Sequence, residues 1–236
     1  MLTQIYGITT AEDAALVTAL GPDHVGVVLD EGIETWDSVD EMALREIRPE
    51  LRTVAVVALS LSTERERILA TVDQVRPAWL HLARAADGLT PEAVGRLGID
   101  VAPVQMMITI PVRDAGAIAL ARRFAGCADA LLLDTAHPET GTVGATGLVH
   151  DWSLSRSVVE AVDVPVILAG GLGPDNVVAA IQQVRPAGVD SETRTSRDDD
   201  RRRKDPERVR LFLQRAQLAE AASLVSSRDP PLFVPR

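Results

Sequence analysis

The pair Gly170-Gly171 is the clearest candidate for a ligand site in this sequence. It follows a short apolar run at residues 164–168, which is typical of a strand buried on both faces. Pro174 and Asp175 come next, and both residue types favour the first turn of a helix. A glycine turn between a strand and a helix exposes N–H groups, which commonly bind phosphate. The motif therefore predicts a phosphate site, with a tight turn that binds nothing as the alternative.

Three side chains that could move protons also stand at the ends of apolar runs. Asp134 follows three leucines, and a carboxylate with apolar walls often does acid–base work. A helix cap or a loop ion pair is the alternative role for Asp134. His81 and Tyr6 end two further runs. A lone histidine is more often hydrogen-bonded within the structure than catalytic, and a phenol at such a position more often packs.

Short apolar runs alternate with longer amphipathic ones in eight strand–helix pairs of roughly thirty residues each. Such alternation requires a parallel sheet, and it predicts a single-domain (β/α)8 TIM barrel over residues 1–225. An open doubly wound sheet is the main alternative. In a TIM barrel the active site lies where the strands end, so the glycine pair and the three side chains would meet at one mouth. The strands are expected at residues 2–6, 24–29, 53–59, 78–81, 101–107, 128–133, 164–168 and 187–190.

Capping residues mark where several helices should begin. Thr10, Thr90 and Asp205 precede helical patterns and are expected to cap them. Residues 63–66, Thr-Glu-Arg-Glu, have the pattern of a capping box. Pro174 is expected to open the helix after the glycine pair.

Three segments lie outside this pattern. Residues 194–205 are dense in both charge signs, which predicts a solvated loop, with a mobile arm over the mouth of the last strand as the alternative. Residues 226–236 contain three prolines and are expected to form an extended surface tail. Asp30 and Glu31 follow the second strand and are expected to be solvated loop acids.

Lysine and histidine usage limits the chemistry. The only lysine, Lys204, lies outside every predicted strand, so a Schiff base on a barrel lysine is excluded. The four histidines lack a metal-ligand spacing such as HxxxH. A metal held by Asp30, His81 and Asp134 together is the one metal site left open. No cofactor is expected.

Bulk properties exclude several classes of protein. With 46% hydrophobic residues, the 236-residue chain can bury a large core, and its net charge of -10 argues against nucleic-acid binding. The single cysteine, Cys127, fits a reducing compartment. No apolar run reaches membrane-spanning length and no signal peptide is evident, so a cytoplasmic location is expected.

Several motifs, in the right order along nearly the whole chain, resemble phosphoribosylanthranilate isomerase, an enzyme of tryptophan biosynthesis. The most specific stretch is residues 165–172, which match the family's Pro-Val-Ile-Leu-Ala-Gly-Gly-Leu. Residues 4–9, Gln-Ile-Tyr-Gly-Ile-Thr, resemble the family's Lys-Ile-Cys-Gly-Ile-Thr. Further similarities lie at Leu80-His81, Leu132-Leu133-Asp134, His150-Asp151-Trp152, Gly188-Val189-Asp190 and Lys204-Asp205.

The resemblance implies an Amadori rearrangement, in which the ribose ring of an N-phosphoribosyl aromatic amine opens and a proton leaves C2. Carried across by position, Asp134 would be the general acid, and Gly170 and Gly171 would hold the phosphate. Thr193 and Arg194 stand in the family's last phosphate loop. There Arg194 would pair with phosphate as a charged fork.

Two departures from the family affect the base and the substrate. Tyr6 stands where the family has its cysteine base, and a phenol with a pKa near ~10 is a poor base. His81 or Asp30 would then be the substitute base. The stretch from Asp30 to Trp36 is acidic where the family has an arginine. We expect Asp30 and Trp36 to contact the amine and to favour a neutral or cationic group over the anthranilate carboxylate.

The preferred function is therefore an isomerase of this family, acting on a phosphorylated sugar as a monomer or homodimer. A phosphosugar epimerase or lyase on the same barrel is one alternative. A barrel that binds a phosphometabolite without catalysis is the other.

Overall fold

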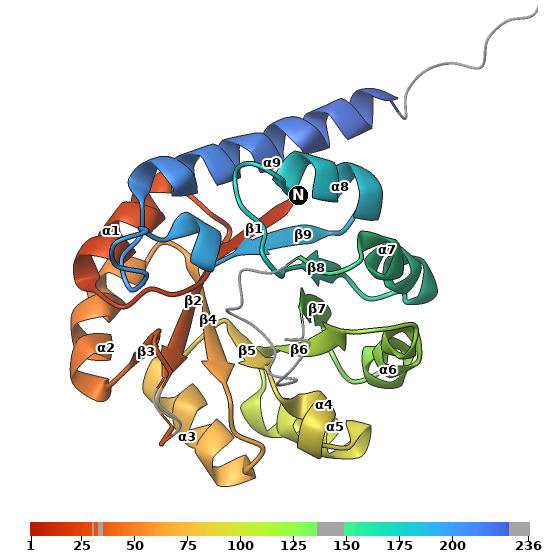
Figure 1. Ribbon diagram of the computed structural model, residues 1–236. Coiled ribbons are helices and arrows are strands. Elements are labelled where there is room, and N and C mark those ends of the chain that lie inside the picture. The colour runs from red at the N-terminus through yellow and green to blue at the C-terminus, as the bar shows by residue number, and fades with distance from the viewer. Residues whose placement is uncertain (30, 33–34, 136–148, 227–236) are drawn as a thin grey trace, which may run out of the picture.

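The computed structural model describes residues 1–29, 31–32, 35–135 and 149–226, and its strands form a closed parallel barrel (Figure 1). The barrel strands are β1 (Leu2–Ile5), β2 (His24–Leu29), β4 (Ala55–Ser60), β5 (Trp79–Leu82), β6 (Gln105–Val112), β7 (Ala130–Thr135), β8 (Val166–Leu168) and β9 (Gly188–Ser191). The barrel closes because β1 pairs with both β9 and β2. A short strand, β3 (Ser38–Val39), pairs with the end of β2. The predicted (β/α)8 barrel is confirmed, and the open-sheet alternative is wrong.

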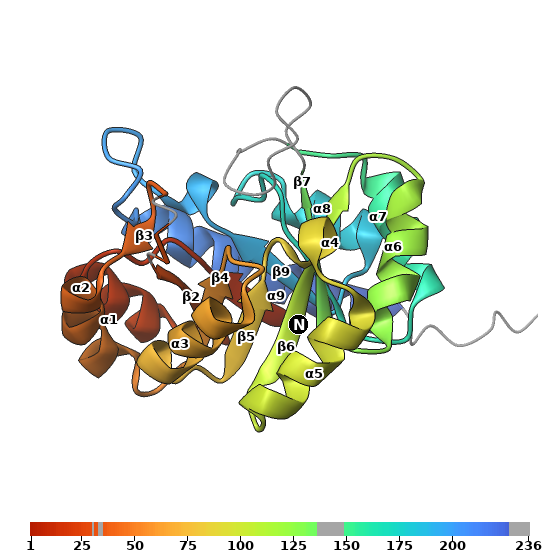
Figure 2. The ribbon, with the colours of Figure 1, turned by 90° about the horizontal axis from the view of Figure 1, so that it is seen from below.

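Helices surround the barrel, as Figures 1 and 2 show from two directions. They are α1 (Ala11–Leu20), α2 (Glu41–Ile47), α3 (Arg65–Val75), α4 (Ala85–Gly88), α5 (Pro91–Val101), α6 (Gly116–Ala125), α7 (Trp152–Ala161), α8 (Val177–Val184) and α9 (Pro206–Ser226), with 3-10 turns η1 (Arg48–Leu51) and η2 (Thr193–Thr195). Helix α9 packs against α1 and α8. Apart from Ser226, which ends α9, the predicted tail at 226–236 lies outside the described residues.

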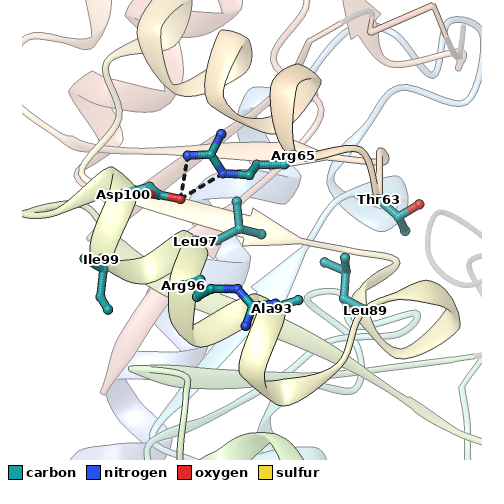
Figure 3. Close-up of a pocket in the computed structure, with 8 residues that line it drawn as sticks. All are labelled: Thr63, Arg65, Leu89, Ala93, Arg96, Leu97, Ile99 and Asp100. Atoms are coloured by element: carbon teal, nitrogen blue, oxygen red, sulfur yellow. Dashed lines mark hydrogen bonds and ion pairs between the residues drawn. The ribbon is translucent and has the colours of Figure 1, made fainter.

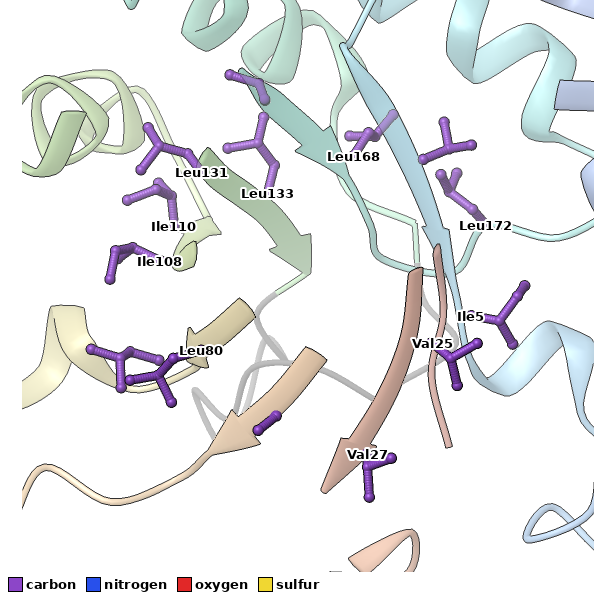
Figure 4. Close-up of a cluster of buried hydrophobic side chains, with 14 of the residues drawn as sticks. Ile5, Val25, Val27, Leu80, Ile108, Ile110, Leu131, Leu133, Leu168 and Leu172 are labelled. Carbon is purple, nitrogen blue, oxygen red and sulfur yellow. The ribbon is translucent and has the colours of Figure 1, made fainter. Parts of the chain in front are cut away.

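The main core lies between the barrel wall and the helices (Figure 4). Alternate strand residues, such as Val25 and Val27 on β2, point outward into it and are fully buried. The remaining strand residues fill the barrel itself, where Met107, Leu132 and Ile167 form a smaller apolar cluster. Burial on both faces explains why the strands are almost continuously apolar.

A tyrosine and a glycine fit together inside the barrel. Tyr6 directly follows β1 and is only 4% exposed. Its ring lies over Gly26 of β2, where an added Cβ would come within 2.1 Å of the ring. Any side chain at position 26 would therefore displace the tyrosine.

The fifth predicted strand, residues 101–107, is wrong in its bounds. Val101 is the last residue of α5, and β6 begins only at Gln105. Val94, Leu97 and Val101 are spaced three and four residues apart, so they line the buried face of the helix. Pro103 disfavours helical backbone at the residue before it, and this separates the helix from the strand.

The predicted caps at Thr10, Thr90 and Asp205 are confirmed, since each side chain accepts a hydrogen bond from the following helical turn. The capping box at residues 63–66 is wrong, because α3 begins at Arg65 with Glu64 at its N-cap and no side-chain cap.

Hydrogen bonds to Glu31, in place of a capping box, fix the path of the loop before α3. Its carboxylate accepts hydrogen bonds from the amides of Leu61 (2.9 Å) and Ser62 (3.0 Å) and from the hydroxyls of Ser60 (2.7 Å) and Thr71 (2.5 Å). The predicted solvated acid is therefore a fixed acceptor that ties the end of β2 to the loop after β4.

Removing this acceptor should destabilise the fold. Glu31→Ala leaves two amides and two hydroxyls without their acceptor, which we expect to lower the free energy of unfolding by about 2 kcal/mol. Urea unfolding measures the change, with Glu46→Ala on the exposed face of α2 as the matched control. A change below ~0.5 kcal/mol for Glu31→Ala would contradict the anchoring role.

Pro174 does not open a helix, because α8 begins at Val177. The intervening turn is held by Asn176, whose side chain donates to the Gly171 carbonyl (2.9 Å) and accepts from the Gly173 amide (2.9 Å). This turn keeps the glycine pair at the end of β8 in a fixed shape.

The charged segment is only partly the solvated loop that was predicted. Residues 197–202 are exposed, but Lys204 is completely buried. Arg203 Nε bonds Asp13 Oδ2 at 2.9 Å on α1. Lys204 Nζ donates to the Glu192 carbonyl (3.0 Å) and to Ser196 Oγ (3.0 Å). The segment therefore folds back and joins the loop after β9 to the start of α1.

Candidate active site

Asp134 is the last residue but one of β7, at the mouth of the barrel, and its carboxyl is held in place. Its Oδ1 accepts from the Thr135 amide at 2.7 Å. The residue as a whole is partly exposed, yet burial of the carboxyl raises its pKa to about 6. Asp190 lies nearby on β9, where burial and then the charge of Asp134 raise the pKa of Asp190 to about 8. Asp134 can therefore hold or release a proton near neutral pH, as a general acid must.

The glycine pair adopts a backbone conformation that other residues avoid. Gly170 and Gly171 have φ angles of 80° and 61°. An added Cβ on Gly170 would lie 2.2 Å from Thr135 Oγ1. That hydroxyl is paired with His150 Nδ1 at 2.9 Å. The turn is thus packed directly against the residue that follows Asp134.

The amides of this turn suit an anion. Within the part of the chain that the structure describes, the N–H groups of Gly170 and Gly171 bond to no backbone or side-chain acceptor. Exposed amides at a strand–helix junction attract phosphate. The geometry fits the predicted phosphate site, although occupancy by phosphate stays a prediction.

Thr193 and Arg194 lie next to this turn, in η2. Arg194 packs along Gly173, and its Nη1 bonds Asp175 Oδ2 at 3.0 Å. The structure therefore brings the loops after β8 and β9 together at the rim, as the phosphate prediction requires.

Tyr6 and His81 form a buried hydrogen-bonded chain with Thr109. The Tyr6 hydroxyl lies 2.7 Å from His81 Nδ1, and His81 Nε2 lies 2.6 Å from Thr109 Oγ1. Burial, followed by the charges of Asp190, Glu192 and Asp37, raises the pKa of Tyr6 well above its ordinary value. Burial lowers the pKa of His81 to about 3.

These pKa shifts bear on the predicted catalytic roles of the pair. Tyr6 stays a protonated phenol, and His81 stays neutral and weakly basic. Both are therefore poor acceptors for a proton on carbon.

The loop after β2 is only partly described. The predicted contact residue Asp30 lies outside the described residues. Trp36 is described, and the Arg201 guanidinium lies 4.6 Å from its ring centre. Arg202 donates to the Trp36 carbonyl at 2.6 Å. Two cations from the far end of the chain thus lie on a loop that the sequence indicated to be acidic.

Four charged residues at this side of the mouth were not predicted from the sequence. Asp37, Asp190 and Lys204 are buried, and Glu192 is partly exposed with one buried carboxyl oxygen. Two signals were available. Asp190 is the one charged residue in an apolar strand, and Lys204 is the only lysine of the chain.

A surface pocket of about 470 Å³ lies between α3 and α5 (Figure 3). It includes the ion pair between Arg65 and Asp100 (2.9 Å) and the exposed side chain of Ile99. It contains none of the residues predicted to do chemistry, so it is not the candidate active site.

Among the described residues, no cluster of three or more His, Cys, Asp or Glu side chains could hold a metal ion. The same residues contain no helix that is both long and apolar enough to span a bilayer.

The family model of N-(5'phosphoribosyl)anthranilate (PRA) isomerase matches residues 3–215 of this chain. The chain belongs to the PRA isomerase family. N-(5'-phosphoribosyl)anthranilate isomerase from Haloferax volcanii is 37% identical over 222 residues, which cover 93% of this chain and 94% of the relative. The predicted family is confirmed.

Solved PRA isomerases share the fold. The enzyme from Thermotoga maritima has a TM-score of 0.75 at 27% identity, over 92% of this chain and 98% of that one. A second PRA isomerase structure, solved in complex with reduced 1-(o-carboxyphenylamino)-1-deoxyribulose 5-phosphate, has a TM-score of 0.73 at 26% identity over the same shares. The acid role of Asp134 and the phosphate role of Gly170 and Gly171 stay predictions.

Proposed function

We propose that this PRA isomerase family member converts N-(5'-phosphoribosyl)anthranilate to 1-(o-carboxyphenylamino)-1-deoxyribulose 5-phosphate, in tryptophan biosynthesis. One observation carries the proposal. Asp134, whose carboxyl pKa is raised to about 6, lies at the barrel mouth beside a glycine turn whose amides bond to no acceptor among the described residues. A proton donor and an anion site at this spacing suit a phosphorylated sugar whose ring must open.

Each predicted site residue has a separate role in the proposed reaction. Asp134 protonates the ribose ring oxygen, and the ring opens to an iminium ion. The amides of Gly170 and Gly171 hold the phosphate, with Thr193 and Arg194 on its other side. Trp36, from the loop after β2, is assigned to the side of the aromatic amine, while the predicted contact residue Asp30 lies outside the described residues. The Trp36 loop carries Arg201 and Arg202, which can offset its acidic residues toward an anthranilate carboxylate.

We also propose that the enzyme acts in the cytoplasm as a monomer or homodimer and binds no nucleic acid. Its net charge of -10 disfavours binding of a nucleic acid, whose backbone carries many negative charges. One sugar phosphate carries far less charge and is repelled less.

A substitution in the glycine turn tests the phosphate role. Gly170→Ala places a methyl group 2.2 Å from Thr135 Oγ1 in a strained backbone conformation, so the turn must shift. We expect KM to rise at least ~10-fold, a loss of about 1.4 kcal/mol in binding. Steady-state kinetics and competition by inorganic phosphate measure the effect.

Gly95→Ala on α5 is the matched control, because an added Cβ there meets nothing within 4 Å. An unchanged KM in folded Gly170→Ala protein would contradict the phosphate assignment.

A further inference from the structure

One carboxyl oxygen of Glu192 lacks a hydrogen-bond partner among the described residues, and it lies beside Gly7, the residue after the position of the family's base. Glu192 follows β9, and its Oε1 is buried without a hydrogen-bond partner in the described part of the chain. An added Cβ on Gly7 would lie 3.1 Å from that oxygen. Because the Tyr6 amide donates to the Ser191 carbonyl at 3.1 Å, the ends of β1 and β9 are adjacent. The Glu192 carboxyl therefore lies next to the backbone of the residue that follows Tyr6.

Two neighbours define the charge of this site. Burial raises the pKa of Glu192 well above its ordinary value, and the nearby carboxyl of Asp37 is the next largest cause. Asp37 itself is only 6% exposed. The charge of the neighbouring Asp37 therefore opposes ionisation of Glu192. Lys204 is completely buried, and its Nζ lies 3.2 Å from the same added Cβ on Gly7. Burial lowers the pKa of Lys204 to about 8, which leaves it mainly charged at neutral pH.

The backbone of this loop is also fixed. Lys204 Nζ holds the Glu192 carbonyl and Ser196 Oγ, both at 3.0 Å. Thr195 Oγ1 donates to the same carbonyl at 2.8 Å. A loop backbone held in this way limits the positions that its side chains can reach, which lowers the entropy cost of placing one of them against a substrate. An unpaired carboxyl oxygen at a fixed place in the mouth is costly for a purely structural residue.

We propose that Glu192 is the general base that takes the proton from C2 of the substrate, in the place that cysteine occupies in the family. The inference rests on the proposed isomerase function. After Asp134 has protonated the ring oxygen, the Glu192 carboxylate removes the C2 proton from the iminium ion. The C2–H electron pair forms the C1–C2 double bond, and the π pair of the C1=N bond moves to nitrogen, so the C1–N single bond is kept. Ketonisation then adds a proton at C1 and releases one from the C2 hydroxyl, so no oxidant or reductant is needed.

This role of Glu192 explains how the reaction can proceed without the family's cysteine at position 6. The residue at the cysteine position, Tyr6, packs into Gly26 and stays protonated. The Glu192 carboxyl, at the end of the neighbouring strand, has an oxygen without a hydrogen-bond partner among the described residues and is placed to take this role.

Glu192→Gln tests the proposal, since glutamine keeps the size of the side chain and removes the basic oxygen. We expect kcat to fall ~10²–10⁴-fold, with KM changed by less than ~3-fold. In Glu192→Ala, added formate should restore part of kcat, because it supplies a carboxylate in the vacated space. A structural role would not give this rescue. Glu160→Gln, an exposed glutamate on α7, is the matched control, and thermal unfolding checks that each variant is folded.

The outcomes separate this inference from the proposed function. If the wild-type protein does not isomerise N-(5'-phosphoribosyl)anthranilate, the proposed function fails. If the wild type is active and Glu192→Gln keeps more than a third of its kcat, Glu192 is not the base. Loss of activity in Tyr6→Phe with Glu192→Gln active would assign the base to Tyr6 instead.

Discussion

Asp134→Asn is expected to abolish isomerisation and, at the same time, to make the protein more stable. Asparagine keeps an oxygen for the Thr135 amide, now 2.7 Å from Asp134 Oδ1, but cannot donate the proton that opens the ring. Loss of a general acid lowers kcat by ~10²–10⁴-fold. The substrate should still bind, because the glycine turn is unchanged.

The gain in stability has a definite pH dependence. Burial raises the pKa of Asp134 in the folded protein to about 6. Ionisation of this carboxyl above that pH therefore costs more free energy in the folded protein than in the unfolded chain. The cost is absent at pH values below the ordinary pKa of aspartate, where both states are protonated. It is full above about pH 6, where it amounts to about 1–3 kcal/mol. Asparagine removes it.

Urea unfolding at pH 3.5 and pH 8 measures this difference. We expect Asp134→Asn to match the wild type at about pH 3.5 and to exceed it by about 1–3 kcal/mol at pH 8. Asp73→Asn on the exposed face of α3 is the control and should be neutral within ~0.5 kcal/mol. Equal stability of Asp134→Asn and wild type at pH 8 would show that the carboxyl is well solvated.

Gly26→Ala is expected to be among the most destabilising single-methyl substitutions in the barrel. The added Cβ would lie 2.1 to 2.5 Å from three ring carbons of Tyr6. The ring cannot move away easily, because its hydroxyl bonds His81 at 2.7 Å inside the barrel. We expect the free energy of unfolding to fall by about 3 kcal/mol.

A double-mutant cycle tests this explanation. Tyr6→Cys removes the ring and, alone, should cost about 2–4 kcal/mol through the cavity and the unpaired His81. In the double variant the methyl group added at position 26 enters that space. The loss of stability in the double variant should therefore be at least ~1 kcal/mol smaller than the sum of the losses in the two single variants. Strict additivity would mean that the ring and the glycine do not restrain each other.

Much of this fold follows from local sequence. The eight strand–helix pairs, the caps at Thr10, Thr90 and Asp205, and the glycine pair after β8 all depend on residues close together in the chain. The phosphate-site and acid predictions used the rule that barrel strands end at the active site, which needs only the strand ends.

Two of the errors came from contacts between residues that are distant in the sequence. The capping box was overridden because Glu31, from the loop after β2, holds the amides before α3. Lys204 looked solvated within a run of charges, but its partners Glu192 and Ser196 fold over it. Val101 was an avoidable error, since its spacing from Leu97 and the proline that follows both indicated the end of a helix.

Conversion of N-(5'-phosphoribosyl)anthranilate by the purified wild-type protein is the most direct measurement of the central claim, that this barrel mouth opens and isomerises a phosphoribosyl amine. Substrate and product are isomers, so they are followed by chromatographic separation over time. We predict a kcat on the order of 1–10 s⁻¹ for the wild type and no detectable conversion by Asp134→Asn. A wild-type protein that binds the substrate but leaves it unchanged, or equal rates for both proteins, would contradict the account.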